Sequence, residues 1–257
     1  MTASTSHPVS ATCPVTYFQP DAPGSYPGVV FLQDGIGPRP ALFEMAQRIA
    51  RAGYVVGLPD LFHRVGSVLD LTPPGQPREF KPLMARVFSD PELRARWRER
   101  YFASASNPEN LARDVEAVLA GFAARSDVRP APFGVVGYCL GGNLALRVAA
   151  LFGDRIAAAA SFHGGSLATD APDSPHLGAP AMRARLLICA AMEDPSLPAD
   201  MQQRLAAALR EAAVVHSIET YPARHGFCVP DAPTFDAAAA ERHYSALTEF
   251  FAQTLGH

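Results

Sequence analysis

Residues 133–142 read Phe133-Gly134-Val135-Val136-Gly137-Tyr138-Cys139-Leu140-Gly141-Gly142, and this stretch decides the fold. It begins as a short apolar run typical of a buried strand, and from Leu140 onward apolar residues recur at helical spacing. Strand, tight turn and helix therefore meet at Cys139. This arrangement predicts a nucleophile elbow, in which glycines allow a strained turn that exposes the reactive side chain. A thiol there also loses its proton more easily than a free thiol, because it feels the positive end of the helix dipole. The alternative is a glycine-rich turn around a buried cysteine.

The composition excludes several classes of protein. Of the 257 residues, 48% are apolar and 18% charged, and the net charge of −3 gives no reason to expect nucleic acid or an anionic membrane as partner. No run of roughly eighteen apolar residues is present to span a bilayer. Residues 1–11 lack the positive start and apolar centre of a secretory signal, so we expect a cytoplasmic protein with free thiols. The cysteines are too few and scattered for a disulfide framework or a zinc motif; they are Cys13, Cys139, Cys189 and Cys228.

Strand and helix patterns alternate through most of the chain. Strands are expected at 15–18, 28–33, 54–58, 133–136, 156–162, 185–191 and 214–221, and helices at 41–52, 109–124, 141–152, 200–212 and 235–255. This alternation predicts an α/β fold in which a mostly parallel central sheet carries helices on both faces. We expect one domain over 1–257.

Residues 62–108 interrupt this alternation. Prolines break the pattern, and arginines cluster at 94, 96, 98 and 100. We expect an irregular insertion over the sheet edge, with one short helix near Pro91–Phe102. The arginines are interpreted as a solvated helix face, and binding of a substrate carboxylate is the alternative.

A reactive thiol needs a base, and the base needs an acid to orient it. In α/β-hydrolases the order along the chain is nucleophile, acid, histidine, with the last two on loops after later strands. Asp194 follows the strand at 185–191, and His225 follows the strand at 214–221. Cys139, Asp194 and His225 are therefore the predicted catalytic residues.

Other acids and histidines have weaker claims. Glu193 is a rival acid, but Asp194 directly precedes a proline turn and fits better. His63 and His163 follow strands, so either could line the pocket, whereas His216 lies in a strand and His243 on a helix. His7, His176 and His257 have no placement that indicates chemistry.

The oxyanion of an acyl-transfer reaction needs two hydrogen-bond donors. We expect the backbone N–H of Leu140 and that of Gly35, in the loop after the strand at 28–33. Asp34 is either a turn residue or a carboxylate that faces the thiol. The candidate contacts of the thiol or the substrate are Asp34, Tyr138, His163 and Phe227.

Taken together, these residues resemble the dienelactone hydrolase family. The likeness rests on Gln33-Asp34-Gly35-Ile36-Gly37, Ala52-Gly53-Tyr54 with Pro59-Asp60-Leu61, Gly137-Tyr138-Cys139-Leu140-Gly141-Gly142, Glu193-Asp194-Pro195 and His225-Gly226-Phe227. The likeness covers most of the chain and is weakest over residues 62–108. The resemblance implies the α/β-hydrolase fold and a Cys-His-Asp triad that hydrolyses a small ester or lactone through a thioester, without metal or cofactor.

The chain departs from the family at two points. The best-known members have a glutamate where Asp34 stands, which helps to activate the thiol, and an arginine shortly after the catalytic histidine, which binds the substrate carboxylate. Here the carboxylate is one methylene shorter, and Cys228-Val229-Pro230-Asp231 contains no arginine. We therefore expect Asp34 to touch the thiol only weakly, and the substrate to differ from a dienelactone.

Two other functions stay open at this point. The acyl group could pass from Cys139 to an acceptor other than water, or the chain could be a hydrolase-like binding module with an idle triad. The second is disfavoured because such a module has no need of all three triad residues. The sequence does not identify the substrate, the pathway or the oligomeric state.

Overall fold

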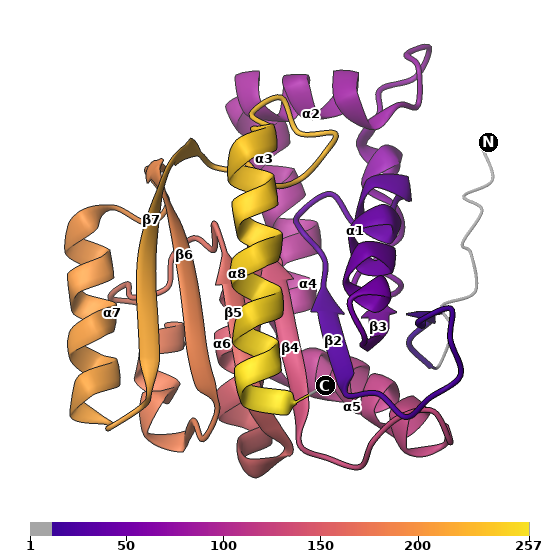
Figure 1. Cartoon of the computed structure of the whole chain (residues 1–257). Coiled ribbons are helices and arrows are strands. Elements are labelled where there is room, and N and C mark those ends of the chain that lie inside the picture. The colour runs from indigo at the N-terminus through magenta and orange to yellow at the C-terminus, as the bar shows by residue number, and fades with distance from the viewer. Residues whose placement is uncertain (1–11, 257) are drawn as a thin grey trace.

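A seven-stranded sheet forms the centre of the structure, a computed structural model that describes residues 12–256 (Figure 1). The strand order is β1-β3-β2-β4-β5-β6-β7, and all neighbours are parallel except β1, which is antiparallel to β3. The strands are β1 (Val15–Phe18), β2 (Gly28–Leu32), β3 (Val55–Pro59), β4 (Phe133–Tyr138), β5 (Ile156–Phe162), β6 (Arg185–Glu193) and β7 (His216–Arg224). The predictions about residues 1–11 and His257 lie outside the described residues.

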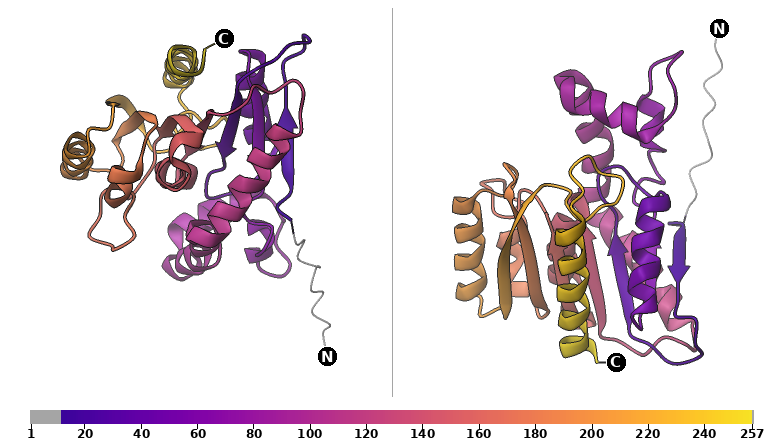
Figure 2. Two further views of the ribbon diagram at one scale, coloured as in Figure 1. Left: turned by 90° about the horizontal axis from the view of Figure 1, so that it is seen from below. Right: turned by 45° about the horizontal axis from the view of Figure 1, so that its top comes forward.

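Helices cover both faces of the sheet. They are α1 (Pro40–Arg51), α5 (Pro108–Ala123), α6 (Leu140–Phe152), α7 (Ala199–Glu211) and α8 (Ala237–Leu255). One apolar layer joins the sheet to α1 and α8, and the other joins it to α5, α6 and α7. In the view from below, α8 (yellow) and α5 (magenta) lie on opposite sides of the sheet (Figure 2).

Burial on both faces explains why the strands read as continuous apolar runs. Along β2, Val29 and Phe31 belong to the layer with α1 and α8, whereas Val30 and Leu32 belong to the layer with α5 and α6. Successive side chains of a strand alternate between faces, so each residue needs to be apolar. The predicted α/β-hydrolase architecture is confirmed.

The segment between β3 and α5 contains more helix than predicted. It holds a 3₁₀ turn η1 (Val68–Leu71), α2 (Phe80–Ser89), α3 (Pro91–Trp97), a π-helical turn η2 (Arg98–Phe102) and α4 (Ala103–Ser106). The sequence predicts no helix at α2, because a proline such as Pro82 breaks a helix when it lies in the interior. Pro82 is the third residue of α2, where backbone N–H groups have no intrahelical acceptor, so the proline removes no helical bond. These helices lie at the top of Figure 1, beyond the carboxyl ends of the parallel strands.

Within residues 12–256, no helix is both long and apolar enough to cross a membrane.

Candidate active site

The turn between β4 and α6 is strained at one residue. Cys139 has φ 54° and ψ −112°, in a region that residues with a side chain rarely adopt. Two sets of backbone hydrogen bonds hold it there. Its N–H donates to Phe162 O at 3.1 Å, and its carbonyl accepts from Gly142 and Asn143 at 3.1 and 3.3 Å. Strain of this kind is maintained by the surrounding structure and is concentrated at functional sites.

The glycines around Cys139 are required by close backbone approach. A Cβ at Gly137 would lie 1.9 Å from Gly141 O, and a Cβ at Gly141 would lie 2.2 Å from Leu32 O. Neither space admits a side chain. The first turn of α6 is consequently packed against the end of β2, which brings the loop after β2 beside Cys139.

Asp194 and His225 meet above the ends of β6 and β7. His225 Nδ1 donates to Asp194 Oδ2 at 2.7 Å, and Ser196 donates to Asp194 Oδ1 through its N–H at 2.9 Å and its hydroxyl at 2.6 Å. Burial acts to raise the pKa of Asp194, but the hydrogen bonds from His225 and Ser196 outweigh it, and the pKa is lowered. The carboxylate therefore stays ionised and fixes the orientation of the His225 ring.

The same histidine contacts the elbow thiol. Burial acts to lower the pKa of His225, but the charge and hydrogen bond of Cys139 and those of Asp194 raise it to about 11. Because Nδ1 is occupied by Asp194, the contact with sulfur falls to Nε2. His225 Nε2 is therefore placed to take the proton of the Cys139 thiol. The structure thus brings together the three residues selected from the sequence.

Glu193 and His243, a rival acid and a rival histidine, lie elsewhere. Glu193 is exposed and its carboxylate is 3.9 Å from Arg224. His243 is fully buried, and its Nε2 is 3.0 Å from the Tyr138 hydroxyl. Burial lowers the pKa of His243 to about 3, so it stays neutral and has a packing role.

The carboxylate of Asp34 is held by its own loop. Oδ1 accepts from Ile36 N–H at 2.9 Å and from Arg39 Nη1 at 2.8 Å, and Oδ2 accepts from Arg39 Nη2 at 2.8 Å. Among residues 12–256, no hydrogen bond joins Asp34 to Cys139. The turn interpretation is therefore the one that the geometry supports, and contact with the thiol is not.

Two of the candidate contacts lie in the apolar core. Tyr138 and Phe227 are fully buried; the Tyr138 ring stacks on Phe162 at 5.7 Å, and Phe227 stacks on Tyr221 at 4.9 Å. The expectation that they touch substrate is wrong because both rings point into the apolar layer beside α8. Proximity to Cys139 and His225 in sequence says nothing about the face to which a ring points.

His163 packs against His225. It is fully buried, its ring lies edge-to-face with His225 at 5.0 Å, and its Nε2 is 3.3 Å from Cys228 Sγ. Burial, followed by the nearby His225, lowers its pKa well below the usual value. His163 is therefore a neutral ring that packs against His225.

A second cysteine, histidine and carboxylate cluster lies where the N-terminal segment meets α5. The donor atoms of Cys13, His63 and Asp114 lie within 4.8 Å of one another, a set that zinc accepts in other proteins. Arg64, however, donates to both Asp114 oxygens at 2.7 Å. Burial and then Asp114 raise the pKa of Cys13, so its thiol stays protonated. We assign this cluster a structural role that ties the loop after β3 to α5.

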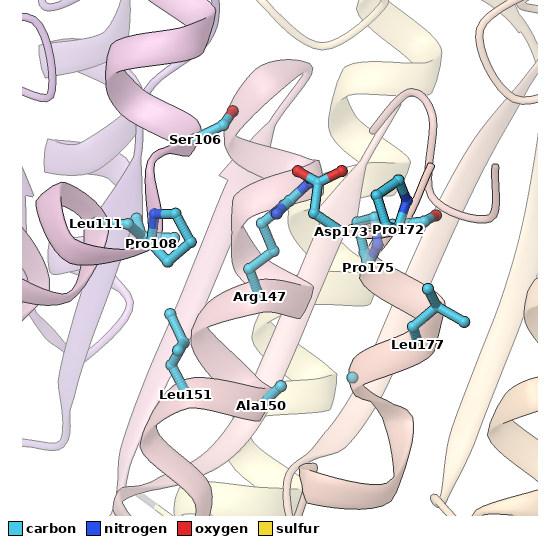
Figure 3. Close-up of a pocket in the computed structure, with 12 residues that line it drawn as sticks. Ser106, Pro108, Leu111, Arg147, Ala150, Leu151, Pro172, Asp173, Pro175 and Leu177 are labelled. Carbon is cyan, nitrogen blue, oxygen red and sulfur yellow. The ribbon is translucent and has the colours of Figure 1, made fainter. Parts of the chain in front are cut away.

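A pocket of about 300 Å³ lies on the outer side of α6 (Figure 3). Arg147 and Asp173, whose charged groups are 3.1 Å apart, border it with Leu151 and Leu177. Cys139 and His225 do not line this pocket.

Two residues that hold the loop after β2 belong to none of the sequence motifs. Trp97 Nε1 donates to Gly35 O at 2.8 Å, and Arg39 binds both Asp34 and Asp231. The one available signal was that Trp97 is the only tryptophan of the chain.

Comparisons with known proteins support the resemblance to the dienelactone hydrolase family. Residues 14–255 match the model of the dienelactone hydrolase family. A carboxymethylenebutenolidase of Rhodococcus opacus is 28% identical over 251 residues, which cover 95% of this chain and 88% of that protein. A dienelactone hydrolase-like promiscuous phosphotriesterase from metagenomic libraries superposes with a TM-score of 0.68 and 21% identity, over 95% of this chain and 94% of the other. A dienelactone hydrolase from Anabaena variabilis has a TM-score of 0.61 and 17% identity, over 96% and 94%.

Proposed function

Because this chain belongs to the dienelactone hydrolase family, we propose that it hydrolyses a small carboxylic ester or lactone through a thioester on Cys139. The observation that carries the proposal is the contact of a strained elbow cysteine with His225, whose other ring nitrogen is 2.7 Å from Asp194. Nucleophile, base and orienting acid are the parts that covalent acyl transfer needs.

In the acylation step, Cys139 Sγ attacks the substrate carbonyl carbon and the carbonyl π electrons move to the oxygen. The N–H groups of Leu140 and Gly35 are the donors proposed to receive this oxyanion. Leu140 begins α6, where a backbone N–H has no intrahelical acceptor and is available to a ligand. When the oxyanion collapses, the C–O bond breaks and His225 gives its proton to the leaving oxygen. In a lactone, that oxygen stays attached to the acyl group.

In the deacylation step, His225 Nε2 takes a proton from water, and the resulting hydroxide attacks the thioester carbonyl. The C–S bond then breaks, the carboxylic acid leaves, and the thiolate and imidazolium re-form. Asp194 keeps the proton on Nδ1 throughout, which leaves Nε2 free for both transfers. The His225 side chain is 34% exposed, which gives water access and supports hydrolysis over transfer to another acceptor.

A cytoplasmic location is part of the proposal. It is supported by the four cysteines, all of which are free thiols, as expected in a reducing compartment.

The proposal is tested with a panel of 4-nitrophenyl esters and simple lactones. We expect wild-type protein to hydrolyse members of the panel, Cys139→Ala to be inactive, and Cys189→Ala, a matched control with a buried cysteine, to keep wild-type activity. Rapid acid quench and intact-mass spectrometry should find one acyl group on wild type and none on Cys139→Ala. Hydrolysis by Cys139→Ala at the wild-type rate would refute the assignment.

A further inference from the structure

We propose that Trp97, with Arg39 as a second anchor, is a positioning residue that holds the loop after β2 so that Gly35 N–H faces the reacting carbonyl oxygen. This inference rests on the proposed acyl transfer at Cys139. It gives the helical segment between β3 and α5, the part of the chain that least resembles the family, a role in the reaction.

The peptide between Gly35 and Ile36 is held at both of its polar ends. Gly35 C=O accepts from Trp97 Nε1 at 2.8 Å, and Ile36 N–H donates to Asp34 Oδ1 at 2.9 Å. In a planar trans peptide these two groups point in opposite directions, so the two bonds determine its plane. The Ile36 N–H already donates to Asp34. The neighbouring backbone donor on the other side of this fixed peptide is Gly35 N–H, which we propose for the oxyanion.

Fixing this peptide matters because residue 35 is a glycine. Glycine has the widest backbone freedom of any residue, so an unanchored Gly35 would let its own N–H turn away from the substrate. Glycine is nevertheless required here, since a Cβ would lie 2.7 Å from the rings of both Trp97 and Phe102. The two rings therefore supply the rigidity that the loop backbone lacks.

The π-helical turn explains how both rings reach Gly35. A π-turn bonds residues five apart and places them on one face, whereas an α-helix does so for residues three or four apart. Trp97, directly before η2, and Phe102, its last residue, are five apart, and their rings meet edge-to-face at 4.7 Å. Regular α-helix would turn Phe102 away from Trp97. π-turns are often found at functional sites.

Arg39 anchors the other side of the loop. Its guanidinium uses all five of its N–H donors, in bonds of 2.7 to 3.1 Å to Asp34, Asp231 and Gly37 O. Asp231 belongs to the loop that follows His225. One buried guanidinium thus sets the position of the oxyanion loop relative to the loop of the base.

The test compares Trp97→Phe with Tyr101→Phe. Each substitution removes one side-chain hydrogen-bond donor from the same helical segment. Tyr101→Phe is the control, because the Tyr101 hydroxyl donates to Ser67 O at 2.6 Å, outside the oxyanion loop. Three quantities are measured: kcat and KM on an ester, the affinity for an aryl trifluoromethyl ketone, and the rate of Cys139 alkylation by iodoacetamide. The ketone forms a hemithioketal in which Sγ bonds to the carbonyl carbon, the oxygen becomes an anion, and His225 keeps the proton.

Deleting an oxyanion donor lowers kcat about 10²- to 10³-fold, so loosening one should lower it about 10-fold. For Trp97→Phe we expect that loss in kcat with KM unchanged, a similar loss in ketone affinity, and a wild-type alkylation rate, because alkylation creates no oxyanion. Tyr101→Phe should match wild type in all three. Unchanged kcat and ketone affinity in Trp97→Phe, or an alkylation rate that falls in parallel, would overturn the inference.

Two further measurements keep the outcome decisive. If Trp97→Phe does not fold, benzothienylalanine at position 97 keeps the bicyclic shape and removes only the N–H, and the same losses are expected. If wild type hydrolyses no ester, the proposed function fails, while ketone affinity still decides whether Trp97 orients the oxyanion donor.

Discussion

Replacing Arg39 by methionine should be strongly destabilising, because it leaves a buried carboxylate without its partner. The Asp34 side chain is 8% exposed and would keep a single hydrogen bond, from Ile36 N–H. Removing one partner of a buried ion pair typically costs about 3–5 kcal/mol of unfolding free energy. The Asp231 side chain is 43% exposed and water can replace the guanidinium there, so Asp231→Asn should cost at most about 1 kcal/mol.

Urea unfolding followed by circular dichroism measures both variants. With a slope of about 2–3 kcal/mol per molar urea, the Arg39→Met midpoint should fall by about 1–2.5 M. The double variant Arg39→Met/Asp34→Asn should regain most of the loss, because an asparagine amide carries no charge to desolvate and still accepts from Ile36. If the double variant is no more stable than Arg39→Met, the cost lies in lost packing, and the buried-charge reasoning is refuted.

The other predictions concern the thiol and its base. One equivalent of iodoacetamide should label Cys139 and not the buried Cys228, which peptide mapping checks; label on Cys228 would contradict the assignment. Asp194→Asn should lower kcat by about 10²- to 10⁴-fold through loss of the correct tautomer, and a decrease of only a few-fold would point to another acid. Asp34→Asn should leave the pH dependence of Cys139 alkylation unchanged, because Arg39 holds that carboxylate; a marked downward shift would show that it gates the thiol. The pKa of His225 is raised to about 11 in the folded protein, so its contribution to stability is complete below about pH 6.5 and declines as the pH rises toward 11. His225→Gln should therefore reduce the urea midpoint more at pH 6 than at pH 10, and an equal loss at both would contradict this.

The sequence was sufficient for the features that depend on neighbours along the chain. Outside residues 62–108, apolar runs and helical spacing predicted the strands and helices to within a few residues, because burial on a sheet face or a helix stripe repeats with a local period. The elbow at Cys139 was visible for the same reason, since its glycines stand two residues before and after the cysteine. The parallel order then brought the loops of Asp194 and His225 to one edge of the sheet, because parallel strands all end there.

Side-chain direction at the ends of strands needed the tertiary structure. Tyr138 is next to Cys139 in sequence and Phe227 is near His225, yet both rings enter the layer beside α8. His163 likewise packs under His225. In a sheet buried on both faces, an apolar residue at a strand end suits either face, so periodicity does not distinguish them.

The contacts that hold the loop after β2 were also decided only by the tertiary structure. Arg39 binds Asp231 across 192 residues of chain, and Trp97 reaches Gly35 across 62. The sequence left Asp34 as either a turn residue or a partner of the thiol. Its ion-pair partner is Arg39, at the start of α1, and no motif in the sequence indicates that pairing. Such bonds form between groups that folding brings together, and their partners leave no periodic signal in the chain.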